Sequence, residues 1–171
     1  VQTIRYPDRQ ENEVLHLSIH YAHPQWIVRR YVDRFGGEQA EAILSANNHR
    51  PMLTLRVNTM RSSMEEIERL LTEAEIKYEV SPVHPSSIMI TSLRDVRALP
   101  LFQNGLVTVQ DASASLAVQL AHPQPGMMVI DLCAAPGGKA VHAAELMNNT
   151  GTVVALEKYE SKLRFIEENA Q

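Results

Sequence analysis

Two shortages in this sequence each exclude a class of protein. Cys133 is the only cysteine among 171 residues, so a disulfide framework is excluded. No apolar run approaches the ~18 residues that a membrane-spanning helix needs. The first ten residues are polar and charged and show no secretory signal. Together these absences favour a soluble cytoplasmic protein without a membrane partner.

The chain also lacks an excess of basic residues. It has 16 Lys and Arg against 20 Asp and Glu, a formal net charge of -4. This balance argues against a strongly basic nucleic-acid module but leaves room for a local basic patch. Two groups of arginines could form one, although a solvated helix face or loop is the simpler interpretation of each group alone. The groups are Arg29, Arg30 and Arg34, and Arg50, Arg56 and Arg61.

The first part of the chain is expected to be helical. Residues 1–22 are interpreted as a leader, a linker or a short helix. A helix then begins at Pro24, because proline suits a first helical turn, and ends at Gly36-Gly37. A second helix follows it. The residues expected to face the core at helical spacing are Trp26, Ile27, Tyr31, Phe35, Ala40, Ile43 and Leu44.

A small α+β domain is predicted next. Residues 53–57 alternate apolar and polar side chains, as a strand does. Ser62 and Glu65 have the spacing of a capping box that opens a helix. Three more short strands are predicted at residues 78–80, 87–91 and 106–109, with an irregular connection over 93–105. This order is typical of a split-βαβ, RRM-like fold.

After Gln110 the pattern becomes that of a parallel α/β domain. Residues 127–132 form a continuous apolar run, typical of a strand buried on both faces of a parallel sheet. The other predicted elements are a helix over 112–121, a helix over 139–147, a strand over 152–156 and a final helix. Residues 111–171 therefore resemble the opening of a doubly wound, Rossmann-like sheet. Only two strands of it are present, which would leave apolar surface and strand edges exposed.

The loop Asp131–Lys139 lies at the carboxyl end of the first parallel strand, where open α/β sheets bind ligands. Gly137 and Gly138 allow the backbone to approach a ligand, and the helix that follows offers free N–H groups. Glu157, 18 residues after Lys139, ends the second strand and can accept hydrogen bonds from both hydroxyls of a ribose. Together these features predict a nucleoside cofactor site.

Two other nucleotide-binding loops do not fit these letters. A dinucleotide-binding loop needs G-x-G-x-x-G, a spacing that Gly137-Gly138 cannot supply. A P-loop needs G-x-x-x-x-G-K followed by Ser or Thr, but Cys133 stands at its first glycine and Ala140 at its last position.

The loop Asp131–Lys139 resembles the S-adenosyl-L-methionine (SAM) motif of the RNA cytosine-C5 methyltransferases. The bacterial Fmu/Sun branch of the NOL/NOP/Sun type, which acts on small-subunit ribosomal RNA, is the most similar. Segments 21–26, 46–58 and 109–113 resemble the family's upstream elements. The resemblance covers residues 21–171 and implies that the chain corresponds to the middle portion of such an enzyme. Residues 23–110 would be its small RNA-binding subdomain, with Arg50, Arg56 and Arg61 as the candidate RNA contacts.

The resemblance also implies a SAM site. The candidate cofactor residues are Cys133, Ala134, Ala135, Pro136, Gly137, Gly138, Lys139 and Glu157. Two positions depart from the family's pattern: Ala140 stands where Thr is common, and Glu157 where Asp is common. Asp131 is expected either to contact SAM or to cap the loop, Asp111 to be a turn or cap residue, and His142 to pack inside.

No catalytic residue is expected in this chain. The family's catalytic cysteines belong to a Pro-Cys and a Thr-Cys loop, which the resemblance places beyond residue 171. Cys133 is therefore expected to be a small buried residue of the cofactor loop.

The resemblance implies a longer parent enzyme that methylates C5 of a cytidine in 16S ribosomal RNA, with SAM as cofactor and no metal. The 171-residue piece is expected to be inactive alone. The alternative is a non-catalytic RNA-binding or assembly module with a vestigial SAM site.

Overall fold

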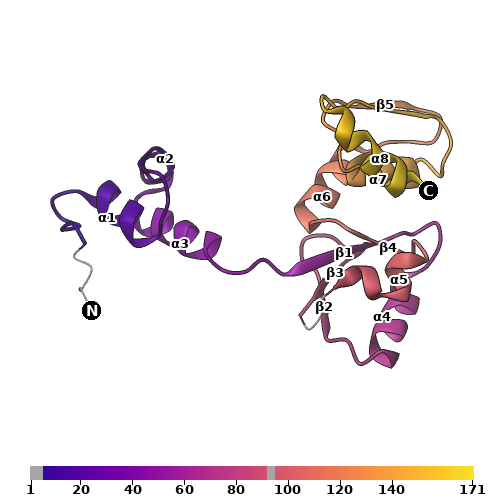
Figure 1. Cartoon of the computed structure of the whole chain (residues 1–171), viewed down its shortest axis with the longest axis horizontal. Coiled ribbons are helices and arrows are strands. Elements are labelled where there is room, and N and C mark those ends of the chain that lie inside the picture. Colours follow the sequence, from indigo (N-terminus) through magenta and orange to yellow (C-terminus); the bar gives the residue numbers. More distant parts are fainter. Residues whose placement is uncertain (1–5, 92–94) are drawn as a thin grey trace. The chain divides into compact units, whose positions relative to one another are not determined.

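The helices and strands of the chain belong to two units, residues 1–51 and residues 52–171 (Figure 1). The computed structural model describes residues 6–91 and 95–171. Residues 1–5 of the expected leader and residues 93–94 of the expected connection therefore lie outside the described part. Each unit is considered by itself below.

The first unit consists of helices α1 (Glu13–His20), α2 (Gln25–Phe35) and α3 (Gly37–Asn47). The Asn12 side chain caps α1 by accepting a hydrogen bond from the N–H of Leu15. Leu17, Val28 and Leu44, one from each helix, are fully buried together. Residues 13–20 thus form a short helix that shares a core with the two predicted helices.

The apolar face of α2 differs from the predicted one. Trp26 is 65% exposed and Phe35 41%, so the expectation that these two side chains face the core was wrong. The face that packs inward carries Val28, Tyr31 and Val32. Since each helical residue advances by about 100°, Trp26 lies nearly opposite Val28, two positions later. The core of this small unit covers only one side of the helix.

The second unit begins with a four-stranded antiparallel sheet in the order β2-β3-β1-β4, which confirms the predicted α+β fold. Its elements are β1 (Leu53–Val57), α4 (Met64–Glu73), β2 (Tyr78–Val80), β3 (Ser87–Ile90), the 3-10 turn η1 (Val96–Ala98), α5 (Pro100–Gln103) and β4 (Val107–Val109). The connection predicted to be irregular therefore contains two short helical turns.

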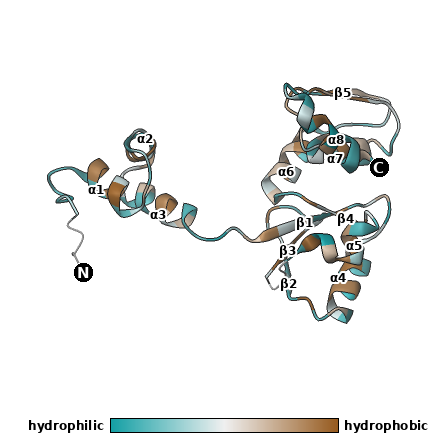
Figure 2. Cartoon of the chain, in the orientation of Figure 1, coloured by the Kyte–Doolittle hydropathy of each residue, from teal (hydrophilic) through white to brown (hydrophobic). Residues whose placement is uncertain are grey.

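Helix α4 begins one residue later than predicted. Its cap is Ser63, whose hydroxyl accepts a hydrogen bond from the N–H of Glu66 at 3.2 Å. Ser62 instead donates its hydroxyl proton to the Glu66 carboxylate. The α4 ribbon carries both apolar and polar segments, as an amphipathic helix does (Figure 2). Its buried residues Ile67 and Leu71 pack against the sheet.

The rest of the second unit is the predicted opening of an α/β domain. Its elements are α6 (Ala112–Ala121), β5 (Met128–Asp131), α7 (Gly138–Leu146), β6 (Thr152–Ala155), the 3-10 turn η2 (Glu160–Lys162) and α8 (Leu163–Ala170). Strands β5 and β6 are parallel, with Ile130 paired to Val154. The Asp111 carboxylate accepts a hydrogen bond from the N–H of Ser113, which confirms Asp111 as a cap residue. No helix among the described residues is long and apolar enough to cross a membrane.

One face of the β5–β6 pair is uncovered. Met128, Ile130 and Leu132 alternate along one face of β5 and are 69%, 57% and 71% exposed. The prediction of a strand buried on both faces is therefore wrong for this chain. The exposed apolar surface expected of a two-stranded sheet is confirmed, because within the described residues α7 packs against the pair from one side.

A buried polar cluster joins the small sheet to α7. Leu55 and Val57 point into the α4 core, so Arg56, between them, points to the opposite face of the sheet. There Arg56, 1% exposed, forms an ion pair with Glu145 of α7, 7% exposed. The Arg56 Nε donates a hydrogen bond to Gln110 Oε1 at 2.6 Å. Because both charges are buried, each depends on the other for compensation.

This ion pair yields a stability prediction. Arg56→Met or Glu145→Met alone would leave the partner's charge buried and unpaired, and should lower the free energy of unfolding by about 3–5 kcal/mol. The double variant Arg56→Met/Glu145→Met should lose clearly less than the sum of the single variants. Urea unfolding followed by circular dichroism measures both losses. Tryptophan fluorescence would not report on this unit, since the sole tryptophan lies in the other one.

The control Arg69→Met removes an exposed pair with Glu73 and should cost at most about 1 kcal/mol. Equal losses in Arg56→Met and Arg69→Met would contradict the assigned role of the buried pair.

His142 extends the same cluster. It is buried, as predicted, and its ring meets the His84 ring edge-on at 5.6 Å between centroids. Burial, with the positive charge of Arg56 and the neighbouring His84, lowers the pKa of His142 to about 3. The folded chain therefore keeps His142 neutral at pH values where the unfolded chain would protonate it.

The depressed pKa predicts a loss of stability in mild acid. Between pH 6.5 and about 3, His142 binds a proton in the unfolded chain but stays neutral in the folded chain. The free energy of unfolding therefore decreases as the pH falls below 6.5. Between pH 7 and 5.5 this loss should be about 1 kcal/mol. It should be absent in His142→Gln and retained in the exposed-histidine control His49→Gln. Identical pH dependence of unfolding in His142→Gln and the parent chain would refute it.

Candidate functional site

The loop that follows β5 is held by its own backbone. The Asp131 Oδ1 accepts a hydrogen bond from the N–H of Cys133 at 3.1 Å, which confirms one of the two expectations for Asp131. The N–H of Gly137 donates to the carbonyl of Ala134, closing a turn. The N–H of Ala134 donates to the carbonyl of Leu156 at 2.9 Å. The loop is therefore fixed to the end of the neighbouring strand β6.

The first turn of α7 presents backbone donors. The helix begins at Gly138, and its N-cap residue, Gly137, offers no side chain to accept their hydrogen bonds. Helix N-termini carry unsatisfied N–H groups and a partial positive charge, which suit a carboxylate or another anionic group. The predicted loop thus ends in a feature that can receive the polar end of a ligand.

Glu157 lies at the same edge of the sheet. Because β5 and β6 are parallel and Asp131 pairs with Ala155, Glu157 follows β6 beside the loop that follows β5. One oxygen of its half-buried carboxylate accepts a hydrogen bond from the N–H of Tyr159 at 3.0 Å. A carboxylate held in this way is a suitable acceptor for ribose hydroxyls.

A second carboxylate oxygen at this edge lacks a partner. Asp131 Oδ2 is buried and makes no hydrogen bond to any described residue. Buried polar atoms in proteins are almost always hydrogen-bonded, and an unpaired one in a loop of this kind fits a site that takes a ligand donor. The residues present therefore fit a small polar cofactor such as SAM.

The backbone conformation and the packing of the loop require glycine at position 137. Its φ is +110°, and a Cβ there would lie 3.1 Å from the Cα of Ile166 in α8. Asn169 of the same helix donates a hydrogen bond to the Pro136 carbonyl at 2.7 Å. Gly138 differs, because a Cβ there would meet nothing closer than Gln110 at 3.7 Å. The backbone of the loop thus requires glycine at the first position of the pair only.

Cys133 is exposed, so the expectation of a small buried cysteine was wrong. It follows Leu132, which lies on the uncovered face of the β5–β6 pair. Within the described residues no element packs over this part of the loop, and the thiol is left at the surface. Lys139 is also exposed, in the first turn of α7.

The three arginines proposed for RNA have different surroundings. Arg56 is buried in its ion pair with Glu145, so it is not at the surface where the sequence analysis placed it. Arg61 is exposed and donates to the carbonyl of Asn104 at 3.4 Å. Arg50 is exposed and belongs to the other unit. The alternation along residues 53–57 indicates only that Arg56 points away from the α4 core, and nothing in that stretch shows what covers the opposite face.

The partners of Arg56 were missed altogether. Glu145 is an acidic residue on the buried side of α7, between the buried residues Ala143 and Met147. Its burial is explained only by its ion pair with Arg56, which lies on a distant strand. Gln110 was treated as a boundary between domains, yet its side chain accepts a hydrogen bond from Arg56, and a Cβ on Gly138 would lie 3.7 Å from it. Among the described residues, no group of three His, Cys, Asp or Glu side chains is placed to hold a metal ion.

Two family models match consecutive parts of the chain. The ferredoxin-like domain of RsmF/B-like methyltransferases matches residues 23–97, and the 16S rRNA methyltransferase RsmB/F model matches residues 118–171. This chain belongs to the RsmB/F methyltransferase family. The resemblance to the Fmu/Sun branch inferred from the loop is thereby confirmed.

Curated members of the RsmB/F family support the assignment. Proteins named ribosomal RNA small subunit methyltransferase B from Yersinia pseudotuberculosis and Yersinia pestis are 40% identical over 172 residues. The match covers 98% of this chain and 40% of theirs, so the chain spans two fifths of the length of these relatives.

Solved structures agree with this fold. A methyltransferase homologue from Pyrococcus horikoshii superposes with a TM-score of 0.82 at 28% identity, over 92% of this chain and 52% of that one. NSun6 from the same organism has a TM-score of 0.77 at 19% identity, over 85% of this chain and 62% of that one, and supports the fold alone. The predicted α+β domain followed by a methyltransferase sheet is thus the RsmB/F fold.

The two glycines should respond differently to alanine in the absence of any ligand. Gly137→Ala would place a Cβ at a positive φ and against the α8 backbone, and should destabilise the chain by about 1–3 kcal/mol. Gly138→Ala is the matched control and should change stability by less than about 1 kcal/mol, because its Cβ has room. Urea unfolding without cofactor measures both. Equal effects would show that the loop does not depend on Gly137 in this way.

Proposed function

We propose that the protein containing this chain transfers a methyl group from SAM to C5 of a cytidine in ribosomal RNA, with 16S RNA as the substrate. The observation that supports this most is the loop Asp131–Lys139 beside Glu157 at the carboxyl edge of two parallel strands, in a chain of the RsmB/F family. SAM, when bound, supplies the methyl group.

The chain's own residues would hold and orient the cofactor. The backbone of Cys133–Lys139 would line the site, and the first N–H groups of α7 would receive the carboxylate of its amino-acid end. Glu157 would accept hydrogen bonds from the ribose hydroxyls. The unpaired oxygen of Asp131 would accept one from a cofactor donor. The loop's ties to β6 and α8 keep these groups fixed before the cofactor arrives.

Activation of the base requires a second set of groups. Cytosine C5 is a poor nucleophile until a thiolate adds to C6 and pushes electron density onto C5. C5 then takes the methyl group, a base removes the C5 proton, and the thiolate leaves. We propose that this thiolate belongs to a cysteine outside the 171 residues and not to Cys133, which lies in the cofactor loop. The target base would be unpaired or flipped out of a helix to reach the site.

A binding module with a vestigial SAM site is the alternative. It is favoured by the presence of a single thiol in the chain, in the loop assigned to the cofactor. The two functions differ in what they require of the loop. An enzyme must bind SAM and its product, S-adenosylhomocysteine, whereas a vestigial site need not.

Cofactor binding tests the proposal directly. In the whole protein, Glu157→Gln should weaken S-adenosylhomocysteine binding by about tenfold or more, because a charge-assisted hydrogen bond to the ribose is lost. The control Glu79→Gln changes an exposed acid of the small sheet and should leave the affinity unchanged. Calorimetry measures the affinities, and incorporation of labelled methyl groups into unmodified small-subunit RNA measures the reaction. Unchanged affinity in Glu157→Gln would contradict the assigned site, and absence of both cofactor binding and label would favour the binding module.

A further inference from the structure

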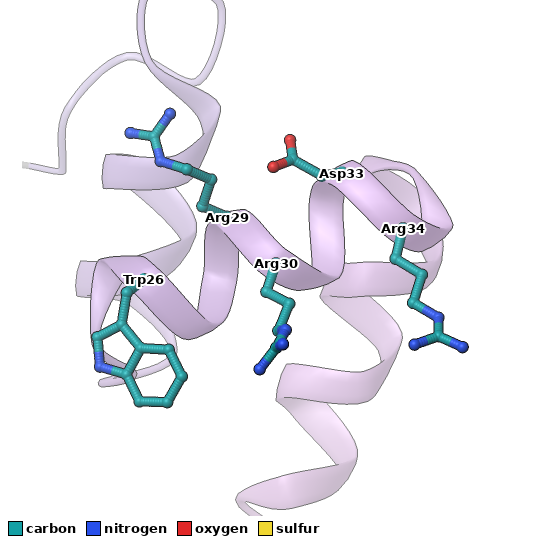
Figure 3. Close-up of a pocket in the computed structure, with 5 residues that line it drawn as sticks. All are labelled: Trp26, Arg29, Arg30, Asp33 and Arg34. Atoms are coloured by element: carbon teal, nitrogen blue, oxygen red, sulfur yellow. The ribbon is translucent and has the colours of Figure 1, made fainter.

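Helix α2 carries an exposed row of one aromatic and two basic side chains. Trp26, Arg30 and Arg34 are spaced four residues apart, so they lie along one side of the helix (Figure 3). Arg29 and Asp33 point to the other side in the same view. These five residues line a surface hollow of about 490 Å³. The row belongs to the helical unit and shares no residue with the SAM loop.

The arginines of this row are not neutralised by the protein. In the same unit Arg9 is paired with Glu13 and Glu41, at 3.0 and 2.6 Å. Within the described residues, none of the three arginines of α2 forms an ion pair. Arg34 lies over the ring of Phe35, 5.5 Å from its centre, and remains exposed. With Asp33 as the one acid among the five hollow residues, the hollow carries a net charge of +2 on a chain whose formal charge is -4. Such a local excess fits an anionic partner.

The exposed indole of Trp26 indicates which kind of anionic partner fits this surface. An indole that is 65% exposed offers a flat apolar surface beside guanidinium groups. Single-stranded nucleic acids are bound by this combination, since bases stack on aromatic rings while arginines contact the phosphates. An acidic protein surface would account for the arginines but would leave the exposed indole without a role.

We propose that the row Trp26–Arg30–Arg34 binds a single-stranded segment of the substrate RNA. Trp26 stacks on an unpaired base, and Arg30 and Arg34 contact consecutive phosphates. The inference rests on the proposed function and deepens it, because it names the residues of the helical unit that contact the RNA. Arg30 and Arg34 take the place of the buried Arg56 as a source of positive charge for the RNA.

The sole tryptophan makes the site directly observable. Trp26 is the only tryptophan in the chain, so its fluorescence reports on this helix alone. When the 171-residue chain is titrated with a fluorescein-labelled 12-nucleotide single-stranded RNA, tryptophan emission should fall in parallel with the rise in RNA anisotropy. A full anisotropy change without any change in tryptophan emission would place the RNA elsewhere and overturn the proposal.

Charge variants test the phosphate contacts. Arg30→Gln/Arg34→Gln should weaken RNA binding by about tenfold or more and reduce the slope of log affinity against log salt by about 1.4, or 0.7 for each lost phosphate contact. The control Arg69→Gln/Arg97→Gln removes the same charge from two exposed arginines that are already paired with acids, and should have a clearly smaller effect. Equal losses in the two double variants would show that only net charge matters and would overturn the proposal.

Stacking is tested separately. Trp26→Ala should weaken binding by about tenfold and Trp26→Tyr by much less, because tyrosine keeps an aromatic face. Circular dichroism confirms that both variants fold, as expected for an exposed position. Vesicles of phosphatidylglycerol are the competing anionic partner. A shift of tryptophan emission with vesicles and none with RNA would assign the row to a membrane surface instead.

Failure of this inference is distinguishable from failure of the proposed function. If the whole protein methylates ribosomal RNA and the Arg30→Gln/Arg34→Gln variant keeps the parent KM for RNA, the row is not a substrate contact and only this inference fails. A raised KM for RNA with an unchanged affinity for S-adenosylhomocysteine supports it. If the whole protein binds RNA through the row but neither binds SAM nor transfers methyl groups, the proposed function fails and RNA binding by the row stands.

Discussion

Arg56 and Glu145 meet between the back of the small sheet and helix α7, where both are almost completely removed from water. A buried charge pair of this kind adds little net stability compared with apolar residues, but it tolerates no other arrangement, because separating the partners leaves an uncompensated charge. It therefore determines how α7 lies against the sheet. Helix α7 begins directly after the loop that follows β5, so the position of that loop relative to the small sheet follows from the same contact.

The surroundings of the pair reinforce this constraint. Gln110 accepts a hydrogen bond from Arg56, and its side chain would lie 3.7 Å from a Cβ on Gly138, the first residue of α7. His142, one turn before Glu145, is held neutral beside the same guanidinium. Polar side chains thus connect the small sheet with helix α7, which begins where the loop after β5 ends. We therefore expect a substitution at this contact in the small sheet to change the position of α7, and the reverse.

Local signals in the sequence were enough to predict most of the fold. The strand over 53–57 and the helix over 112–121 are observed with the predicted bounds, because side-chain alternation and helix caps are encoded within a few residues. The loop Asp131–Lys139 and Glu157 follow the ends of the two parallel strands, as predicted, and their role in binding a cofactor stays a prediction. The capping serine was placed one residue early, since Ser62 and Ser63 are both capable caps and the letters alone do not separate them.

The predictions that failed concern which other parts of the chain pack against a helix or strand. The bounds of the helices and strands themselves were predicted better. Trp26 was placed in the core because it is apolar, but the side of α2 that packs is decided by Leu17 and Leu44 on other helices. Arg56 was placed at the surface because it is charged, and only a carboxylate 89 residues away explains its burial. The apolar run of β5 predicted burial on both faces, yet the run does not encode what covers each face. In each case the deciding partner is distant in the sequence.

That distance also has a consequence for the order of assembly. All the strands of the small sheet come from residues 53–109, so the sheet can form as soon as that stretch of chain is available. Gln110 directly follows β4 and comes with the sheet, so Arg56 on the back of the sheet then lacks only Glu145, which lies 89 residues further along the chain. Contacts of long sequence separation form late, because the entropy of closing the intervening chain must be overcome first. The guanidinium would thus spend the early part of folding as a solvated surface charge, and the docking of α7 against the back of the sheet would be the step that dehydrates it.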